Sequence, residues 1–134
     1  MNRTSLVKAA ATVREFAYAP YSNFRVGAAV MSKSGNVFVG CNIENASLGL
    51  TICAERAAVA AALANGNREF VAIAVVTDFP NVVFPCGACR QILSEFNPSM
   101  DVIAATTQGK SETISLAELL PRPSEKILRQ VPDV

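Results

Sequence analysis

The sequence contains no histidine, and this absence excludes several kinds of hydrolytic site. A serine hydrolase with a histidine base, a cysteine hydrolase with a histidine partner and a zinc site with imidazole ligands all require that residue. Acting alone, the chain can hold a metal ion only through cysteine or carboxylate groups. Four cysteines and 11 acidic residues are available for this purpose.

The chain also lacks an excess of charge of either sign. Twelve basic and 11 acidic residues leave a formal net charge of +1, which gives no broad positive field for a phosphate backbone. No apolar run approaches the roughly 18 residues of a membrane helix, and no apolar segment of a signal peptide follows Arg3 and Lys8. We therefore expect a cytoplasmic protein with reduced cysteines, whose ligand is a small molecule and neither a nucleic acid nor a membrane.

The residues that are present favour one compact domain over residues 1–134, with a carboxy-terminal extension after about residue 121. A hydrophobic content of 51% in 134 residues suits a single core. Apolar spacing and turn residues predict helices at about 3–16, 54–65, 88–96 and after Ser115, and strands at about 26–32, 36–43, 70–77, 102–107 and 113–114. This order predicts a three-layer α/β sandwich with a mixed sheet of about five strands, an initial hairpin and crossover helices.

Two short cysteine motifs carry the chemistry of the chain. Cys86 and Cys89 lie three positions apart at the start of a predicted helix, so both sulfurs face one point and the helix start favours thiolates. Cys53 supplies a third sulfur at the start of another predicted helix. Three thiolates leave the fourth tetrahedral position of a zinc ion for water, as in catalytic sites. Cys41, in the middle of a predicted strand, is expected to be a core residue.

Glu55 lies two residues after Cys53 and is poorly suited to be a ligand. At a helix start it is expected to point to the open side of the ion, where it can carry protons between water, a ring nitrogen and a departing amine. Arg56 follows and is a candidate donor to the thiolates, as is Arg90 beside Cys89. Together these groups indicate the hydrolytic deamination of a cytosine-like base.

Four stretches of the chain resemble the cytidine deaminase family, specifically its short, homotetrameric, three-cysteine type. They are residues 21–29 (YSNFRVGAA), 42–47 (NIENAS), 53–58 (CAERAA) and 85–91 (PCGACRQ), in the family's order and spacing. The likeness extends from about residue 5 to Pro121. It implies the family's sandwich fold, a hydrolase acting on the C–N bond of a cyclic amidine, and a place in pyrimidine salvage.

The resemblance also assigns roles to individual residues. Cys53, Cys86 and Cys89 match the zinc ligands and Glu55 matches the catalytic acid and base. The positions that match substrate-binding residues are Phe24, Asn42, Glu44 and Ala54. An amide and a carboxylate at the end of a strand suit ribose hydroxyls, which agrees with the match of Asn42 and Glu44. The segment at Ala46 resembles one that reaches the site of a neighbouring subunit, and the implied partners are a pyrimidine nucleoside and other copies of the chain.

Two positions depart from the family pattern. Leu48 stands where the family commonly carries tyrosine, and residues 122–125 (RPSE) stand where it commonly carries phenylalanine. Each missing aromatic contact removes about 0.5–1.5 kcal/mol of stacking. We expect a roomier pocket over the base, in which cytidine binds more weakly and C4-modified pyrimidines gain entry.

Other functions for the same cysteines remain open. A deaminase of blasticidin-type antibiotics uses the same metal motifs, although Asn42 and Glu44 argue for a ribose-like ligand. A catalytically silent zinc-binding module has no use for Glu55, and a redox disulfide between Cys86 and Cys89 predicts a metal-free protein. The helix at 57–64 is small and apolar on nearly every side, which favours packing in the core and against other subunits.

Overall fold

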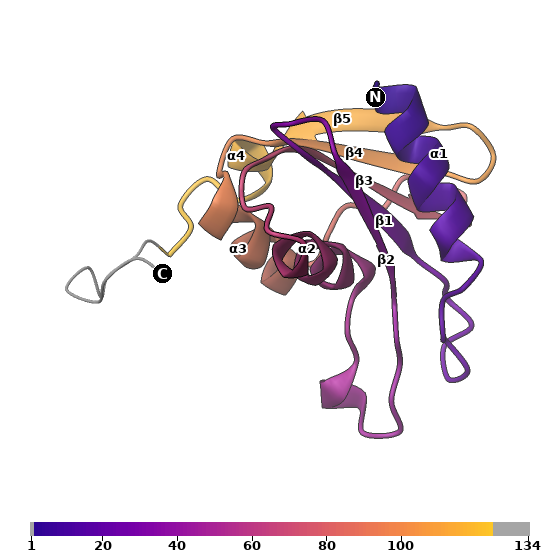
Figure 1. Cartoon of the computed structure of the whole chain (residues 1–134). Helices are drawn as coiled ribbons and strands as arrows, with labels where there is room; N and C mark the ends of the chain where they lie inside the picture. Colours follow the sequence, from indigo (N-terminus) through magenta and orange to yellow (C-terminus); the bar gives the residue numbers. More distant parts are fainter. Residues whose placement is uncertain (1, 125–134) are drawn as a thin grey trace.

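The structure is a computed structural model and describes residues 2–124 (Figure 1). The elements are α1 (Arg3–Arg14), β1 (Gly27–Ser32), β2 (Val37–Cys41), the 3₁₀ helix η1 (Leu48–Leu50), α2 (Ala54–Ala64), β3 (Phe70–Thr77), α3 (Gly87–Phe96), β4 (Asp101–Thr106), β5 (Ser111–Ser115) and α4 (Leu116–Leu119). Most of the predicted carboxy-terminal extension, including Glu125, lies outside the described residues. Within residues 2–124, no helix is both long enough and apolar enough to cross a bilayer.

The five strands form one mixed sheet in the order β2-β1-β3-β4-β5. Strand β1 runs antiparallel to β2 and β3, and β4 runs antiparallel to β5. Strands β3 and β4 are parallel, so the chain must cross over between them, and α3 lies in that connection. Residues 33–36 connect β1 to β2, with Gly35 at a φ of 92°. The predicted hairpin and mixed sheet are confirmed.

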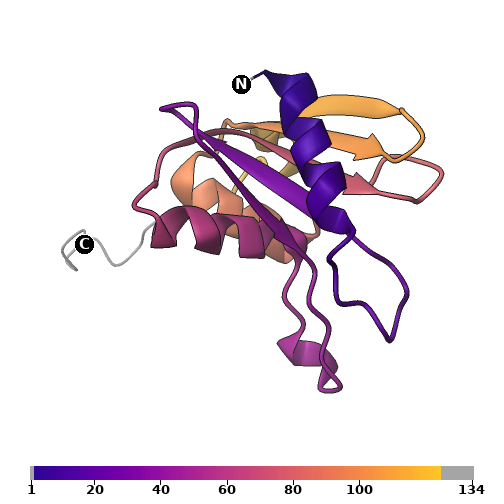
Figure 2. The same ribbon diagram turned by 45° about the vertical axis from the view of Figure 1, so that its right-hand side comes forward.

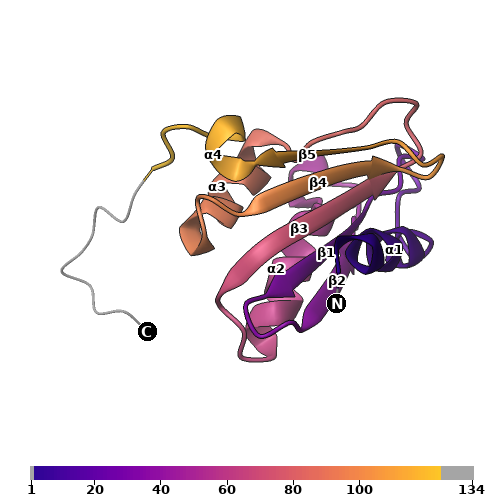
Figure 3. The same cartoon turned by 90° about the horizontal axis from the view of Figure 1, so that it is seen from above.

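Helices cover both faces of the sheet and create two apolar layers. Figures 2 and 3 show α1 on one face and α2 on the other. Beneath α1, Leu6 and Ala10 are fully buried against alanines of β3. On the opposite face, Ala58 of α2 and Leu93 of α3 pack with Ile73 of β3. The three-layer α/β sandwich is therefore confirmed.

Gly40 allows β2 to approach the backbone of α2. A Cβ atom at this position would lie 2.4 Å from the Ala58 nitrogen and 2.7 Å from the Ala54 carbonyl oxygen, which is closer than real Cβ contacts. Only glycine fits such an approach without a shift of the helix. The contact holds the carboxyl end of β2 against the first turn of α2, where two groups of predicted site residues meet.

Candidate metal centre

Three cysteine sulfurs converge at the starts of α2 and α3. Cys53 directly precedes α2, Cys86 directly precedes α3, and Cys89 lies in the first turn of α3. The three Sγ atoms lie within 4.8 Å of one another. Tetrahedral zinc, with Zn–S bonds of about 2.3 Å, places its sulfur ligands about 3.8 Å apart. The cluster therefore fits a zinc ion held by three thiolates, and Cys41, in β2, is not a member of it.

The ionisation of the cluster suits a cation. A hydrogen bond from the Cys89 thiol and the nearby Arg56 guanidinium lower the pKa of Cys53 to about 5. The same hydrogen bond and burial raise the pKa of Cys89. The two sulfurs share one hydrogen bond, which favours the anion on Cys53 and the protonated form of Cys89. Binding of zinc requires that this proton leave, because each ligand must be a thiolate.

Arg56 lies where the sequence predicts a donor to the thiolates. Its Nη2 atom donates to Cys53 Sγ at 3.8 Å and to the Thr51 carbonyl oxygen at 3.1 Å. The guanidinium charge offsets part of the negative charge of three thiolates. Arg90, the second candidate donor, binds backbone carbonyls. Its Nε donates to Pro85 at 2.6 Å and its Nη1 to Leu119 at 3.0 Å, which joins α3 to α4.

Glu55, in the first turn of α2, is a buried carboxyl group beside the sulfur cluster. Its exposed fraction is 5%, and desolvation by burial raises its pKa to about 7. The charges on Cys53 and Arg56 and a hydrogen bond with Cys89 also act on its ionisation. Glu55 is not one of the three grouped ligands. The site thus combines a metal cluster with a separate carboxyl group that changes protonation state near neutral pH.

The residues that follow β2 run beside the segment that enters α2. Ile43 and Ile52 exchange two backbone hydrogen bonds of 2.9 Å in an antiparallel bridge. Asn42 and Glu44 flank Ile43, and Cys53 directly follows Ile52. This pairing places the predicted ribose-binding residues next to the metal cluster, although the two segments are separate in the sequence.

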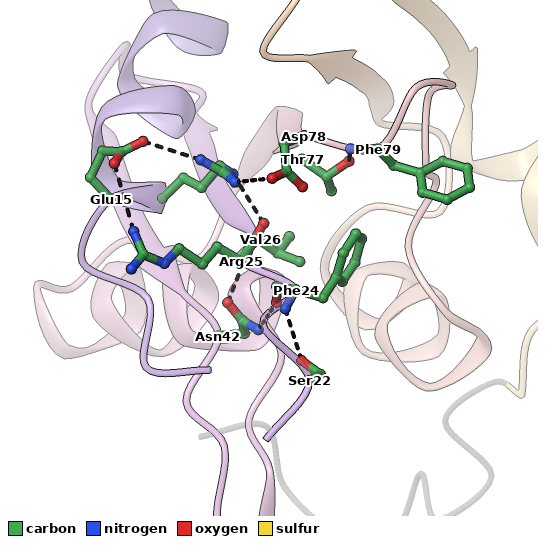
Figure 4. Close-up of polar contacts among 10 residues, drawn as sticks. Glu15, Ser22, Phe24, Arg25, Val26, Asn42, Thr77, Asp78 and Phe79 are labelled. Atoms are coloured by element: carbon green, nitrogen blue, oxygen red, sulfur yellow. Dashed lines mark hydrogen bonds and ion pairs between the residues drawn. The ribbon is translucent and has the colours of Figure 1, made fainter. Parts of the chain in front are cut away.

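The side chain of Asn42 holds the backbone before β1. Its Oδ1 accepts a hydrogen bond from the Val26 N–H at 2.9 Å, and its Nδ2 donates to the Phe24 carbonyl oxygen at 2.8 Å (Figure 4). Asn42 is buried, and these bonds leave one amide N–H for another partner. The structure thus adds a positioning role that sequence reasoning missed.

Glu44 acts on the same segment two residues further on. It accepts hydrogen bonds from the Tyr21 N–H at 2.9 Å, from the Ser22 N–H at 3.1 Å and from the Ser22 hydroxyl. These bonds, the hydroxyl bond foremost, lower the pKa of Glu44. The spacing of Asn42 and Glu44 is a sequence signal for this shared role, because residues two apart in an extended chain face the same side.

Phe24 and Ala54 complete the set of predicted site residues. Phe24 is half-buried, its N–H donates to Ser22 Oγ at 3.0 Å, and its ring points away from Asn42 in Figure 4. Ala54 is fully buried at the first position of α2, and Val26 packs against the core cluster that contains it. The structure therefore groups the cysteines with Glu55, Arg56 and Ala54, and links Phe24 to them through Asn42.

Comparisons with known proteins agree with this arrangement. Residues 1–106 match the family model described as the cytidine and deoxycytidylate deaminase zinc-binding region. A cytidine deaminase of Halalkalibacterium halodurans is 52% identical over 122 residues, which cover 90% of this chain and 92% of that protein. A crystal structure of cytidine deaminase from Burkholderia pseudomallei superposes with a TM-score of 0.89 and 49% identity, covering 92% of this chain and all of the other. A blasticidin-S deaminase of Bacillus cereus is 33% identical over 104 residues, which cover 72% of this chain and 74% of that protein.

Proposed function

This chain belongs to the cytidine and deoxycytidylate deaminase family, and we propose that it catalyses the zinc-dependent hydrolytic deamination of cytidine or 2′-deoxycytidine. The products are the corresponding uridine nucleoside and ammonia. One observation carries the proposal: three cysteine sulfurs converge beside the buried carboxyl group of Glu55. A closed structural zinc site has four protein ligands and needs no carboxyl group of this kind.

Each group at the centre has a role in this reaction. Cys53, Cys86 and Cys89 would hold the zinc ion, which would lower the pKa of a water molecule and so supply the nucleophile. Glu55 takes a proton from the attacking water and gives it to N3 of the base as the water oxygen adds to C4. The same carboxylate then carries the second water proton to the 4-amino group. The C4–N bond breaks, ammonia leaves, and Glu55 is again ionised.

Neighbouring residues bind the nucleoside. The free N–H of the Asn42 amide and the carboxylate of Glu44 are assigned to the ribose hydroxyls. Phe24 forms a wall of the pocket, and Ala54 presents backbone groups at the first turn of α2, where N–H groups have no partner within the helix. The bonds that Asn42 and Glu44 make to residues 21–26 support this assignment, because they fix the sugar-binding side chains and the Phe24 segment as one unit.

Turnover of a nucleoside panel tests the proposed substrate. Zinc-loaded protein is expected to deaminate cytidine and 2′-deoxycytidine and to accept enlarged N4 substituents, followed by loss of ultraviolet absorbance. Acceptance follows from Leu48, whose side chain is 71% exposed on η1 and offers no stacking ring. Refusal of every enlarged substituent would contradict the roomier pocket but not the proposed deamination of cytidine. Activity on a blasticidin-type antibiotic without activity on either nucleoside favours the alternative substrate.

Exposed apolar side chains support assembly into a homotetramer. Leu48 and Leu50 on η1 are 71% and 67% exposed, and this segment projects from the body of the fold (Figure 1). Isolated chains rarely present such a surface to water. Sedimentation at micromolar concentration is expected to give about four times the 14.2 kDa of one chain. A fully active species of 14.2 kDa would contradict a site shared between subunits.

Family membership also supports a place for the reaction in pyrimidine salvage and a cytoplasmic location. The net charge of +1 favours a free nucleoside over a nucleic acid or an anionic membrane surface as the partner. Residues 1–134 are proposed to act as one deaminase domain.

A further inference from the structure

Arg14, the last residue of α1, is a buried cation with partners in three segments. Its side chain is 9% exposed. Its Nε donates to the Arg25 carbonyl oxygen at 3.1 Å, its Nη2 lies 2.9 Å from Asp78 Oδ2, and its Nη1 lies 3.1 Å from Glu15 Oε1. The guanidinium therefore joins the end of α1 to the approach to β1 and to the turn after β3.

The first of these partners belongs to the Phe24 segment. Arg25 lies between Phe24 and Val26. The Asn42 amide binds the carbonyl oxygen of Phe24 and the N–H of Val26. Residue 25 is consequently held from two sides: by Arg14 at its own carbonyl oxygen and by Asn42 at its neighbours. The direction of the Phe24 side chain follows from this backbone.

The second partner begins the connection that leads to the metal cluster. Asp78 directly follows β3 and starts the segment that ends at Cys86. The turn is closed locally, because the Phe79 N–H donates to Thr77 Oγ1 at 3.2 Å. Pairing of Gly27 with Val76 brings this turn beside the start of β1. Arg14 therefore lies between two segments that adjoin the proposed pocket.

The base of the Arg14 side chain is itself fixed by close packing. A Cβ atom on Gly27 would lie 2.0 Å from the Ala10 carbonyl oxygen and 2.8 Å from Arg14 Cβ. Helix α1 thus contacts the first residue of β1 without an intervening side chain. The Cβ atom of Arg14 is fixed by this packing, and its guanidinium is planar and rigid with several N–H donors. It can therefore hold the Arg25 carbonyl oxygen and Asp78 at set positions.

We infer that Arg14 is a positioning residue for the nucleoside pocket, which fixes the Phe24 segment relative to the Asp78 turn. The inference rests on the proposed function, since Phe24 forms a pocket wall only if a nucleoside binds there. Lysine keeps the charge but has a single nitrogen, so it cannot bind the Arg25 carbonyl and Asp78 in the same geometry. Displacement of a pocket wall weakens substrate binding more than it slows chemistry.

Steady-state kinetics on the zinc-loaded protein test this role. Arg14→Lys is expected to raise KM for cytidine about tenfold and Asp78→Asn about threefold, with kcat within about twofold of wild type. The inhibition constant of the product uridine is expected to rise in parallel. Arg3→Lys is the matched control, because Arg3 begins the same helix, forms an exposed ion pair with Asp101 and contacts neither segment. Its KM and kcat are expected to equal those of wild type.

The outcomes separate positioning from general stability. A merely structural role lowers the amount of active protein, and therefore kcat, while KM stays at the wild-type value, which would overturn the inference. If Arg14→Lys does not fold, Asp78→Asn provides the test of positioning, since Asp78 is half-exposed and its replacement leaves the core intact. An unchanged KM in that folded variant overturns positioning, whereas a wild-type protein inactive on cytidine rejects the proposed function and the inference with it.

Discussion

Cys89→Ser is expected to lose its zinc ion and to reduce cytidine turnover to background. Cys89 is fully buried in the first turn of α3, and its sulfur is one of three that converge within 4.8 Å. A serine hydroxyl stays protonated near neutral pH and does not replace a thiolate ligand. With two ligands left, bound zinc measured after gel filtration is expected to fall from about one ion per chain to nearly none, and kcat/KM by at least about 10³-fold.

Cys41→Ser is the matched control for this substitution. Cys41 is a free, partly buried cysteine in β2 and does not belong to the cluster. The same change of sulfur to oxygen is therefore expected to leave zinc content and turnover at wild-type values. Full zinc occupancy in Cys89→Ser, or loss of zinc in Cys41→Ser, would show that the ion is held elsewhere.

Glu55→Gln is expected to keep its zinc and its fold while kcat falls by about 10²–10⁴-fold. The amide has the size of the carboxyl group but cannot accept a proton from water and return it to the substrate. Because Glu55 is buried, a neutral side chain of equal volume fits the site without a charge to desolvate. Metal analysis, circular dichroism and single-turnover rates on one preparation separate the loss of chemistry from a loss of structure.

Glu112→Gln provides the corresponding control. Glu112 is exposed on β5, at the opposite edge of the sheet from β2, and removal of its charge is expected to leave kcat unchanged. If zinc-loaded Glu55→Gln retains turnover within about tenfold of wild type, which is below the usual contribution of a general acid and base, Glu55 is not the proton carrier.

Local sequence pattern predicts the elements that bury apolar residues. Strand β3 has the predicted bounds, Phe70–Thr77, because a continuous apolar run suits a strand covered on both faces. Helices α2 and α3 start where the cysteine motifs predict. By contrast, β5 extends over Ser111–Ser115, beyond the two residues predicted, because its polar sequence becomes a strand through pairing with β4. Pairing of this kind depends on distant residues.

The polar links around the proposed nucleoside site are harder to predict, since each joins segments that are far apart in the chain. Helix α1 ends at Arg14, two residues before the predicted end, and nothing in the local pattern indicates that this arginine reaches Asp78. Position beside a cysteine suggests a thiolate partner for Arg90, yet its side chain binds Pro85 and Leu119. Sequence spacing identifies the groups that gather at the metal centre, and tertiary packing decides which backbone each polar side chain holds.

The most direct test of a catalytic metal centre is X-ray absorption at the zinc edge of the active, wild-type protein. Three sulfur ligands at about 2.3 Å and one lighter oxygen or nitrogen ligand at about 2.0 Å are expected. The light-atom ligand is expected to persist in Glu55→Gln, because the carboxyl group is not one of the grouped ligands. Four sulfur ligands, or full cytidine turnover by protein without zinc, would contradict a site of three thiolates with one exchangeable position.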